Sequence, residues 1–232
     1  SITKWELFTG ILPPFTSSQW NIYFLEYKKI PEFIYLNSNI TLKEFKVIFY
    51  WEYFHRLFGR VIGLVYIIPL IIFTFVKILN KKTLLTFYFI FFLILLQGII
   101  GWYMVESGLT LNVSVSHYRL SLHLFLAFII ISFLIWNFLN YKNNKIKEFF
   151  NLKPVLPKIF FILILFQIII GAFVSGLDAG LIYQTWPKMN LSYFPDDLKL
   201  LDSNLINLLN NQSFVQFIHR TTAYIIILLA LF

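Results

Sequence analysis

The sequence contains no cysteine, and only 13% of its 232 residues are charged. Without cysteine, disulfide bonds, thiolate metal sites and thiol catalysis are excluded. A soluble domain carries about a quarter charged residues, so the scarcity of charge argues against a soluble fold. Hydrophobic residues instead make up 59% of the chain, and the mean hydropathy is +0.74. This composition is typical of an integral membrane protein.

Acidic residues are the scarcer charged class, with 11 Asp and Glu against 19 Lys and Arg and a net charge of +8. In a membrane protein such a basic excess sets the orientation of the loops, so we expect a lipid bilayer as partner and no nucleic acid. No cleavable signal pattern is visible at the start. The chain begins at Ser1 and ends at Phe232 within an apolar run, so we expect a piece of a longer protein.

Long apolar runs predict the fold class, because about 20 such residues cross the hydrocarbon layer as a helix. Five runs qualify, and they predict an all-α, polytopic transmembrane helix bundle with spans at 47–79, 84–105, 117–139, 158–177 and 212–232. An amphipathic, aromatic segment is expected at 1–46, and polar segments are expected at 106–116 and 178–211. Thr41 and Glu44, three residues apart before the first apolar run, predict a capping box that opens the first helix.

The lysines predict the orientation of the bundle. They gather in the link after the first span and in the link after the third, whereas the link between the second and third spans has no Lys or Arg. Cytoplasmic and matrix loops carry the excess of Lys and Arg. Both lysine-rich links are therefore expected on that side of an inner membrane, bacterial or mitochondrial. The segments 1–46, 106–116 and 178–211, and the histidine-bearing ends of the spans, then face the periplasm or intermembrane space.

The chain contains two internal repeats. Glu-Tyr-Phe-His-Arg at 52–56 recurs as Gln-Phe-Ile-His-Arg at 216–220, and Gln-x-x-x-Gly occurs at both 97–101 and 167–171. Sites of membrane proteins often form where such repeats meet. We predict two pseudo-repeated four-helix halves, the first in 1–140 and the start of the second in 141–232. The Gln-x-x-x-Gly pairs are predicted to be helix-packing devices, since small and amide residues let spans approach and hydrogen-bond.

Three of the four histidines, His55, His123 and His219, lie ~10–12 Å below the outer ends of their spans at roughly 1.5 Å per residue. Polar residues at membrane depth are rare and mark function. Neutral imidazole binds iron without adding buried charge, so a set of histidines on spans favours haem iron. The structural alternative is a capping or interfacial role. His117 lies about 120° from His123 and ~9 Å nearer the surface, so we interpret it as an interfacial or propionate-side residue.

Glu52 lies three residues before His55, about 60° around the helix, so both can face one pocket. An intramembrane carboxylate is a functional hypothesis by default, and we predict that Glu52 exchanges protons. The alternative is a structural ion pair with a neighbouring arginine. Gln216, at the matching position, cannot titrate, so proton-coupled chemistry is expected in one half only. Guanidinium groups match haem propionates, which makes three arginines candidate propionate contacts: Arg56, Arg119 and Arg220.

Several long motifs share their order with one known family. They are Phe-Tyr-Trp-Glu-Tyr-Phe-His-Arg-Leu-x-Gly-Arg at 49–60, the segment 97–123 with its two histidines, the segment 171–187 ending in Trp-Pro, and Gln-Phe-x-His-Arg at 216–220. These motifs resemble those of the haem A synthases, and the resemblance covers essentially the whole chain. It is close to the cysteine-free branch found in mitochondria and alphaproteobacteria.

The resemblance implies an eight-span bundle that oxidises a methyl group of haem O to the formyl group of haem A, by successive hydroxylations, for terminal oxidase assembly. It implies that His55 and His123 hold the substrate haem and that Glu52 is needed for activity. His219 would be one axial ligand of a haem b, whose second ligand would lie beyond Phe232. The implied partners are haem O, a haem O synthase and an electron-transfer partner, and a homo-oligomer is compatible with them.

Two other functions stay open on the residues alone. A di-haem b-type membrane cytochrome that oxidises quinol uses similar histidine layers, although the Trp186-Pro187 motif disfavours it. A non-enzymatic transporter would use Glu52 and the arginines as an intramembrane relay.

Overall fold

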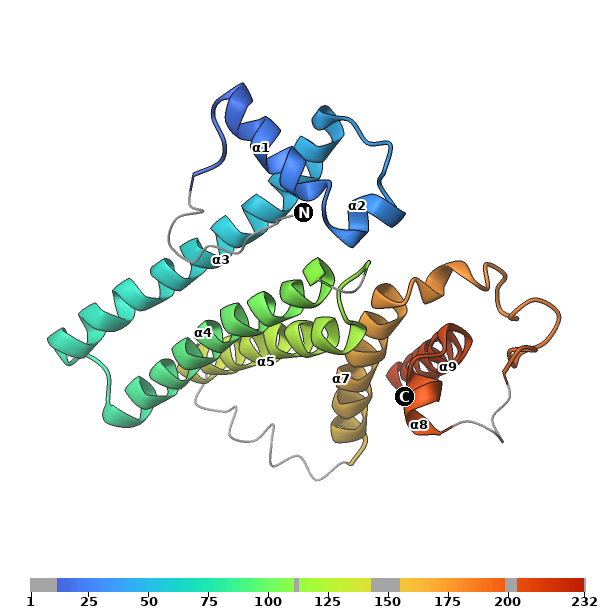
Figure 1. Ribbon diagram of the computed structural model, residues 1–232. Helices are drawn as coiled ribbons and strands as arrows, with labels where there is room; N and C mark the ends of the chain where they lie inside the picture. Colours follow the sequence, from blue (N-terminus) through green and yellow to red (C-terminus); the bar gives the residue numbers. More distant parts are fainter. Residues whose placement is uncertain (1–11, 111–112, 143–154, 199–203, 232) are drawn as a thin grey trace. The chain divides into compact units, whose positions relative to one another are not determined.

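The computed structural model describes residues 12–110, 113–142, 155–198 and 204–231. The regular structure of this part is helical, apart from one antiparallel bridge between Met189 and Ser192. Five helices are long and apolar enough to cross a membrane (Figure 1): α3 (Leu42–Val76), α4 (Lys81–Thr110), α5 (His117–Lys142), α7 (Val155–Gly176) and α9 (Gln212–Ala230). The predicted all-α polytopic class is therefore confirmed.

The chain divides into two compact units, Ser1–Val115 and Ser116–Phe232. The first contains α1 (Ser17–Tyr27), α2 (Pro31–Tyr35), α3 and α4, and the second contains the remaining elements. This division follows contacts within the described chain, whereas the predicted boundary at 140/141 follows the sequence repeat. The prediction of two pseudo-repeated halves therefore stays a prediction.

The start of α3 is the capping box that the sequence predicts. The backbone N–H of Thr41 donates to the Glu44 carboxylate at 2.7 Å, and the N–H of Glu44 donates to the Thr41 hydroxyl at 3.4 Å. Two backbone donors that have no partner inside the helix are thereby satisfied. The helix begins at Leu42, a full turn before the predicted span.

The end of α4 differs from the prediction. The segment 106–116 was expected to be a polar link, but α4 continues through Glu106 to Thr110. Ser107 shows why polar residues do not end the helix here: its hydroxyl donates to the Met104 carbonyl at 2.6 Å, so it is satisfied inside the helix.

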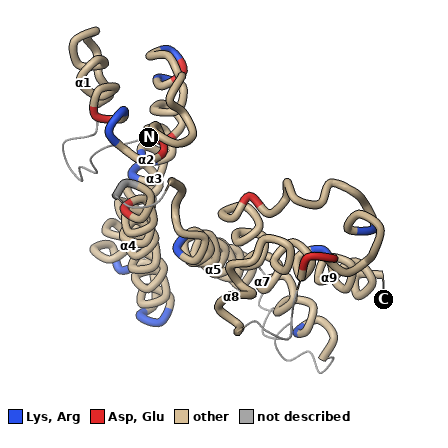
Figure 2. The backbone as a smooth tube through the Cα atoms, turned by 45° about the vertical axis from the view of Figure 1, so that its right-hand side comes forward, with Lys and Arg blue, Asp and Glu red and all other residues tan. Residues whose placement is uncertain are grey.

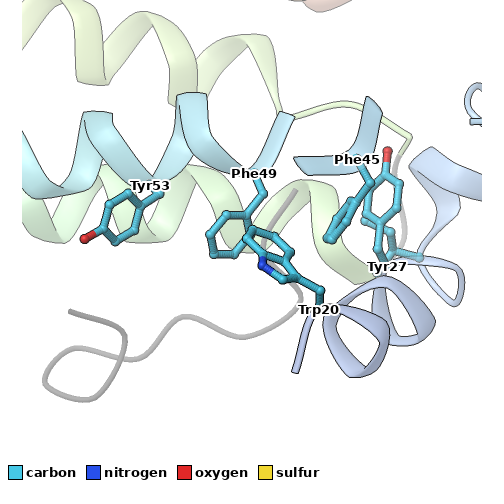
Figure 3. Packing of buried hydrophobic residues seen from close by; sticks show 6 residues of the cluster. Trp20, Tyr27, Phe45, Phe49 and Tyr53 are labelled. Atoms are coloured by element: carbon cyan, nitrogen blue, oxygen red, sulfur yellow. The ribbon is translucent and has the colours of Figure 1, made fainter. Parts of the chain in front are cut away.

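An aromatic cluster fixes α1 against the first turns of α3. Figure 3 shows its labelled members, of which Tyr27 and Phe45 are fully buried: Trp20, Tyr27, Phe45, Phe49 and Tyr53. The last three recur every four residues and so form one face of α3. Because this face is held by α1, the rotation of α3 about its axis is set, and with it the directions in which the next residues point.

A polar network forms around Tyr27, one member of this cluster. The Tyr27 hydroxyl donates to the Glu32 carboxylate at 3.0 Å and accepts from the Asn37 amide at 2.9 Å. Burial raises the pKa of Tyr27 to about 12, so its hydroxyl stays protonated at neutral pH. The segment between α1 and α3 is thereby tied to the same aromatic side chain that packs on α3.

In the second unit, α7 lies between α5 and α9 (Figure 1). Gly176 permits the contact with α5, since a Cβ built on it would lie 2.8 Å from the His117 Cβ and 2.9 Å from its Cα. On the other side, Ile170 and Phe173 of α7 pack against Val215 of α9. The short helices η2 (Ala179–Leu181) and α8 (Leu205–Leu209) lie in the segment that joins α7 to α9.

Figure 2 colours the charged residues: those of α4, α5 and α7 lie near the helix ends, whereas α3 and α9 also carry charges farther along, at Glu52, Arg56, Arg60 and Arg220. The turn from α3 to α4 carries Lys77, Lys81 and Lys82, one of the two lysine-rich links of the sequence. In the other link, Lys145, Lys147 and Lys153 lie outside the described residues.

Candidate functional site

His219 of α9 packs against Gln167 and Gly171 of α7, and we call these two residues the cradle of His219. A Cβ built on Gly171 would lie 3.1 Å from the Cε1 of the His219 ring and 3.7 Å from its Nδ1. The Gln167 amide nitrogen donates to the His219 carbonyl at 3.1 Å and lies 3.4 Å from the ring Nε2. Gln167 and Gly171 are one turn apart on the same face of α7. The second copies of both sequence repeats therefore meet at this imidazole.

The cradle fits an axial haem ligand. The Nδ1 of His219 and the Oε1 of Gln167 are buried and have no hydrogen-bond partner among the described residues. Buried polar atoms are normally paired, so an unpaired imidazole nitrogen beside a glycine is suited to bind a metal. No group of three or more His, Asp or Glu able to hold a metal ion occurs in the described part. Haem iron needs only one or two protein ligands, because the porphyrin supplies the others.

Glu52 and Arg56 form an ion pair on α3, with 3.8 Å between the Glu52 Oε2 and the Arg56 Nη1. The Arg56 side chain is 18% exposed and that of Glu52 is 39% exposed. The structural pairing that the sequence left open is thus present. It leaves the predicted proton exchange by Glu52 untested, since a paired carboxylate still titrates. His55 follows Glu52 on the same helix and is exposed within this chain.

Three of the predicted residues lie on α5: His117, Arg119 and His123. His117 is its first residue, and its ring centroid lies 5.0 Å from that of Phe173 in α7. His117 therefore occupies the packed junction of α5 and α7, and its predicted place at the membrane interface or beside a propionate stays a prediction. Arg119 and His123 follow on α5 and are half-buried. His55 and His123 belong to different units, and their joint role as ligands of the substrate haem stays a prediction.

Arg220 and Gln216 hold the loop that follows α7. The Gln216 amide accepts from the Tyr183 N–H at 3.3 Å and donates to the Tyr183 carbonyl at 2.9 Å. The Arg220 guanidinium donates to the carbonyls of Tyr183 and Thr185, the latter at 2.8 Å. In this structure the guanidinium therefore binds carbonyl groups of the loop. The predicted propionate contact of Arg220 stays a prediction. The two residues are one turn apart on α9, as Glu52 and Arg56 are on α3.

Asp197 ties the far end of the same loop to α9. Its carboxylate accepts from the Ser213 hydroxyl at 2.6 Å and from the Tyr183 hydroxyl at 2.5 Å. These bonds hold the pKa of Asp197 below its ordinary value. Burial raises the pKa of Tyr183, and the bond to Asp197 acts in the same direction, so the tyrosine remains the donor. The loop is therefore fastened to the helix that carries His219.

Replacing Asp197 with Asn is expected to weaken this attachment by about 1 kcal/mol at neutral pH, because charge-assisted hydrogen bonds become neutral ones. A depressed pKa means that the carboxylate stabilises the fold above its unfolded value of about 3.9, and that this contribution is lost as the pH falls through the folded-state pKa. The measurement is thermal unfolding of wild type and variant at neutral pH and at pH values well below about 3.9.

The difference between wild type and variant should vanish at low pH, and a difference of equal size at both pH values would contradict the assignment. Asp196→Asn is the matched control. Its carboxylate accepts from Ser192 within the loop, so no comparable loss at neutral pH is expected.

Four residues of the site were not predicted for their roles: Gln167, Gly171, Tyr183 and Asp197. Gln167 and Gly171 were predicted to pack helices, and they do, but specifically against the predicted ligand. The signal that pointed to this was the recurrence of Gln-x-x-x-Gly alongside the recurrence of the His-Arg pair. Tyr183 lies in a motif of the family resemblance, whereas Asp197 gave no signal.

Comparison with known proteins shows the family to which the chain belongs. A family model described as "Cytochrome oxidase assembly protein" (COX15-CtaA) matches residues 1–232, the whole chain. The chain belongs to this family. The prediction of a relative of the haem A synthases is therefore confirmed. No solved structure matches the chain significantly.

Individual members of the cytochrome oxidase assembly family are similar over nearly all of the chain. A "Heme A synthase" of Pelagibacter ubique is 54% identical over 230 residues, covering 98% of this chain and 67% of the relative. Those of Wolbachia pipientis wMel and Parvibaculum lavamentivorans are 43% and 40% identical, covering 99% and 98% of this chain and 66% of each relative. The chain thus spans about two thirds of the length of the curated relatives it matches.

Proposed function

We propose that, in a protein of the length that its relatives have, this chain acts as a haem A synthase, which oxidises a methyl group of haem O to the formyl group of haem A for terminal oxidase assembly. Family membership over the whole chain supports the reaction class. The structural observation that carries the proposal is the cradle of His219, where a buried imidazole nitrogen that has no hydrogen-bond partner among the described residues lies beside a glycine.

The two halves have different tasks. In the first, His55 and His123 position the substrate haem O, and Glu52 takes up and releases the protons of the oxidation. Arg56, paired with Glu52 at 3.8 Å, keeps a positive charge beside that carboxylate.

In the second half, His219 would hold the iron of haem b, which would supply one-electron transfer. Gln216 takes the place of Glu52 in the repeat and cannot carry a proton, and it is engaged with the Tyr183 backbone. Arg119 and His117 are candidate contacts of haem propionates.

The orientation follows from the lysines. With the turn of Lys77, Lys81 and Lys82 on the cytoplasmic or matrix side, the histidine-bearing ends of α3, α5 and α9 face the periplasm or intermembrane space. The loop held by Arg220 then lies on that outer side. Electrons leave the substrate toward an electron-transfer partner, and a haem O synthase supplies the substrate.

Haem extraction and chromatography test the proposal. The protein, at the length of its relatives, is expressed with a haem O supply, and its haems are separated. Haem A or hydroxylated haem O together with haem b is the expected result. Haem b alone, with haem O untouched, would overturn the synthase proposal and favour the quinol-oxidising cytochrome. Absence of any haem would overturn it in favour of the transporter.

A further inference from the structure

We propose that Gln167 and Gly171 of α7 are positioning residues for His219, setting the rotation of its imidazole and thereby the bond it makes to haem b. This inference rests on the proposed function, because that function makes His219 an axial ligand. It assigns to two residues outside the histidine motifs a direct influence on the spectrum and redox potential of the haem.

Gly171 leaves room for the ring. A Cβ at this position would approach the Cε1 of His219 to 3.1 Å, which is tighter than nine in ten real Cβ contacts. Any side chain here must therefore turn the ring or separate α7 from α9. This demand is local: a Cβ at Gly63 of α3 would meet nothing within 4 Å, so glycines on the spans are not all required by contact.

Gln167 holds the same residue from one turn away. Its amide nitrogen bonds the His219 carbonyl at 3.1 Å and lies 3.4 Å from the ring Nε2. One amide thus approaches both the main chain and the imidazole of the ligand. Groups that contact a metal-binding histidine fix its tautomer and orientation, and their loss changes metal affinity by about 10–100-fold. Gln167 and Gly171 contact His219 in this way, within the spanning part of α7.

The sequence repeat gives an independent argument. Gln-x-x-x-Gly occurs twice, on the span that follows His55 in one half and on the span before His219 in the other. A general packing device has no reason to accompany each His-Arg pair. A pair of residues that orients the histidine is expected to recur with it. The same function is therefore expected of Gln97 and Gly101 toward His55.

The test uses the protein at the length of its relatives, with Gly171→Ala and Gln167→Leu as the probing variants. Gly63→Ala is the matched control, since it adds the same methyl group where there is open space. Gly176→Ala is a packing control, because its Cβ would meet His117 at 2.8 Å and not His219. Each protein is examined for haem b content, for the electron paramagnetic resonance g-values of oxidised haem b, and for its midpoint potential.

Gly171→Ala and Gln167→Leu are expected to shift the g-values and the midpoint potential, or to lose haem b about 10–100-fold more readily. Gly63→Ala should match wild type, and Gly176→Ala should lower thermal stability without shifting the g-values. Wild-type g-values and potential in both probing variants would overturn the inference alone. A wild-type protein without haem b would instead overturn the proposed function, and the inference with it.

Discussion

Glu52→Gln is expected to abolish the conversion of haem O to haem A while the protein still binds haem. The glutamine keeps the size and the hydrogen-bonding capacity of the side chain but cannot exchange a proton. General acid–base groups contribute about 10²–10⁴-fold to a rate, so the loss should be at least about 100-fold. The measurement is the ratio of haem A to haem O extracted after expression with a haem O supply.

The ion pair between Glu52 and Arg56 gives a second explanation for such a loss, and one variant separates the two. Arg56→Gln removes the positive charge, and with it the ion pair at 3.8 Å, but leaves the Glu52 carboxylate in place. If Glu52 acts through its proton, Arg56→Gln should retain the conversion that Glu52→Gln loses. Equal loss in both variants would assign Glu52 to the ion pair, and unchanged haem A production in Glu52→Gln would remove it from the mechanism.

Features that depend on neighbours along the chain could be predicted from the sequence. The capping box of Thr41 and Glu44 is an example, because its two partners are three residues apart and need no other part of the fold. The spanning helices likewise follow from the length of their apolar runs. The error at the end of α4 has the same origin, since Ser107 is polar by composition but satisfied within its own helix.

Features that depend on the register of two helices could not be predicted. That Gly171 faces His219, and that Gly176 faces His117, requires knowing how far α7 is shifted along α9 and α5. The direction of Arg220 depends on a loop whose path the sequence does not contain. Its guanidinium was predicted for a propionate, but it donates to the carbonyls of Tyr183 and Thr185. The histidines could be identified from the sequence because a polar, ligating side chain is rare in an apolar span. The residues that contact them could be identified only from the structure.

The two halves of the repeat use the same helix positions differently, and this difference is informative. In the first half the pair at these positions is an ion pair, Glu52 with Arg56. In the second, Gln216 and Arg220 both bind the Tyr183 backbone. Replacing an acid with an amide converts a position suited to protons into one that holds a loop. This difference agrees with the proposal that the second half binds haem and transfers electrons without proton chemistry.

His219→Leu is expected to remove haem b and, with it, haem A formation. Leucine fills much of the volume of the imidazole against Gly171 but offers no lone pair, so the iron loses the ligand that His219 is proposed to supply. Because contacting groups alone are worth about 10–100-fold in metal affinity, loss of the ligand itself should exceed this range. The measurement is haem b content by reduced-minus-oxidised absorbance in the purified protein.

His117→Leu is the control within the same unit. His117 is a half-buried histidine near the outer end of its span, but its ring packs on Phe173 and its Cβ faces Gly176. Loss of His117, a candidate propionate contact, is expected to leave haem b bound, because the proposed iron ligand His219 is unchanged and the imidazole of His117 lies at the junction of α5 and α7, outside the cradle. Retention of haem b in His219→Leu together with its loss in His117→Leu would reverse the assignment of the two histidines. The carrier of the electron-transfer haem would then be the helix junction, and the unpaired nitrogen of His219 would need another explanation.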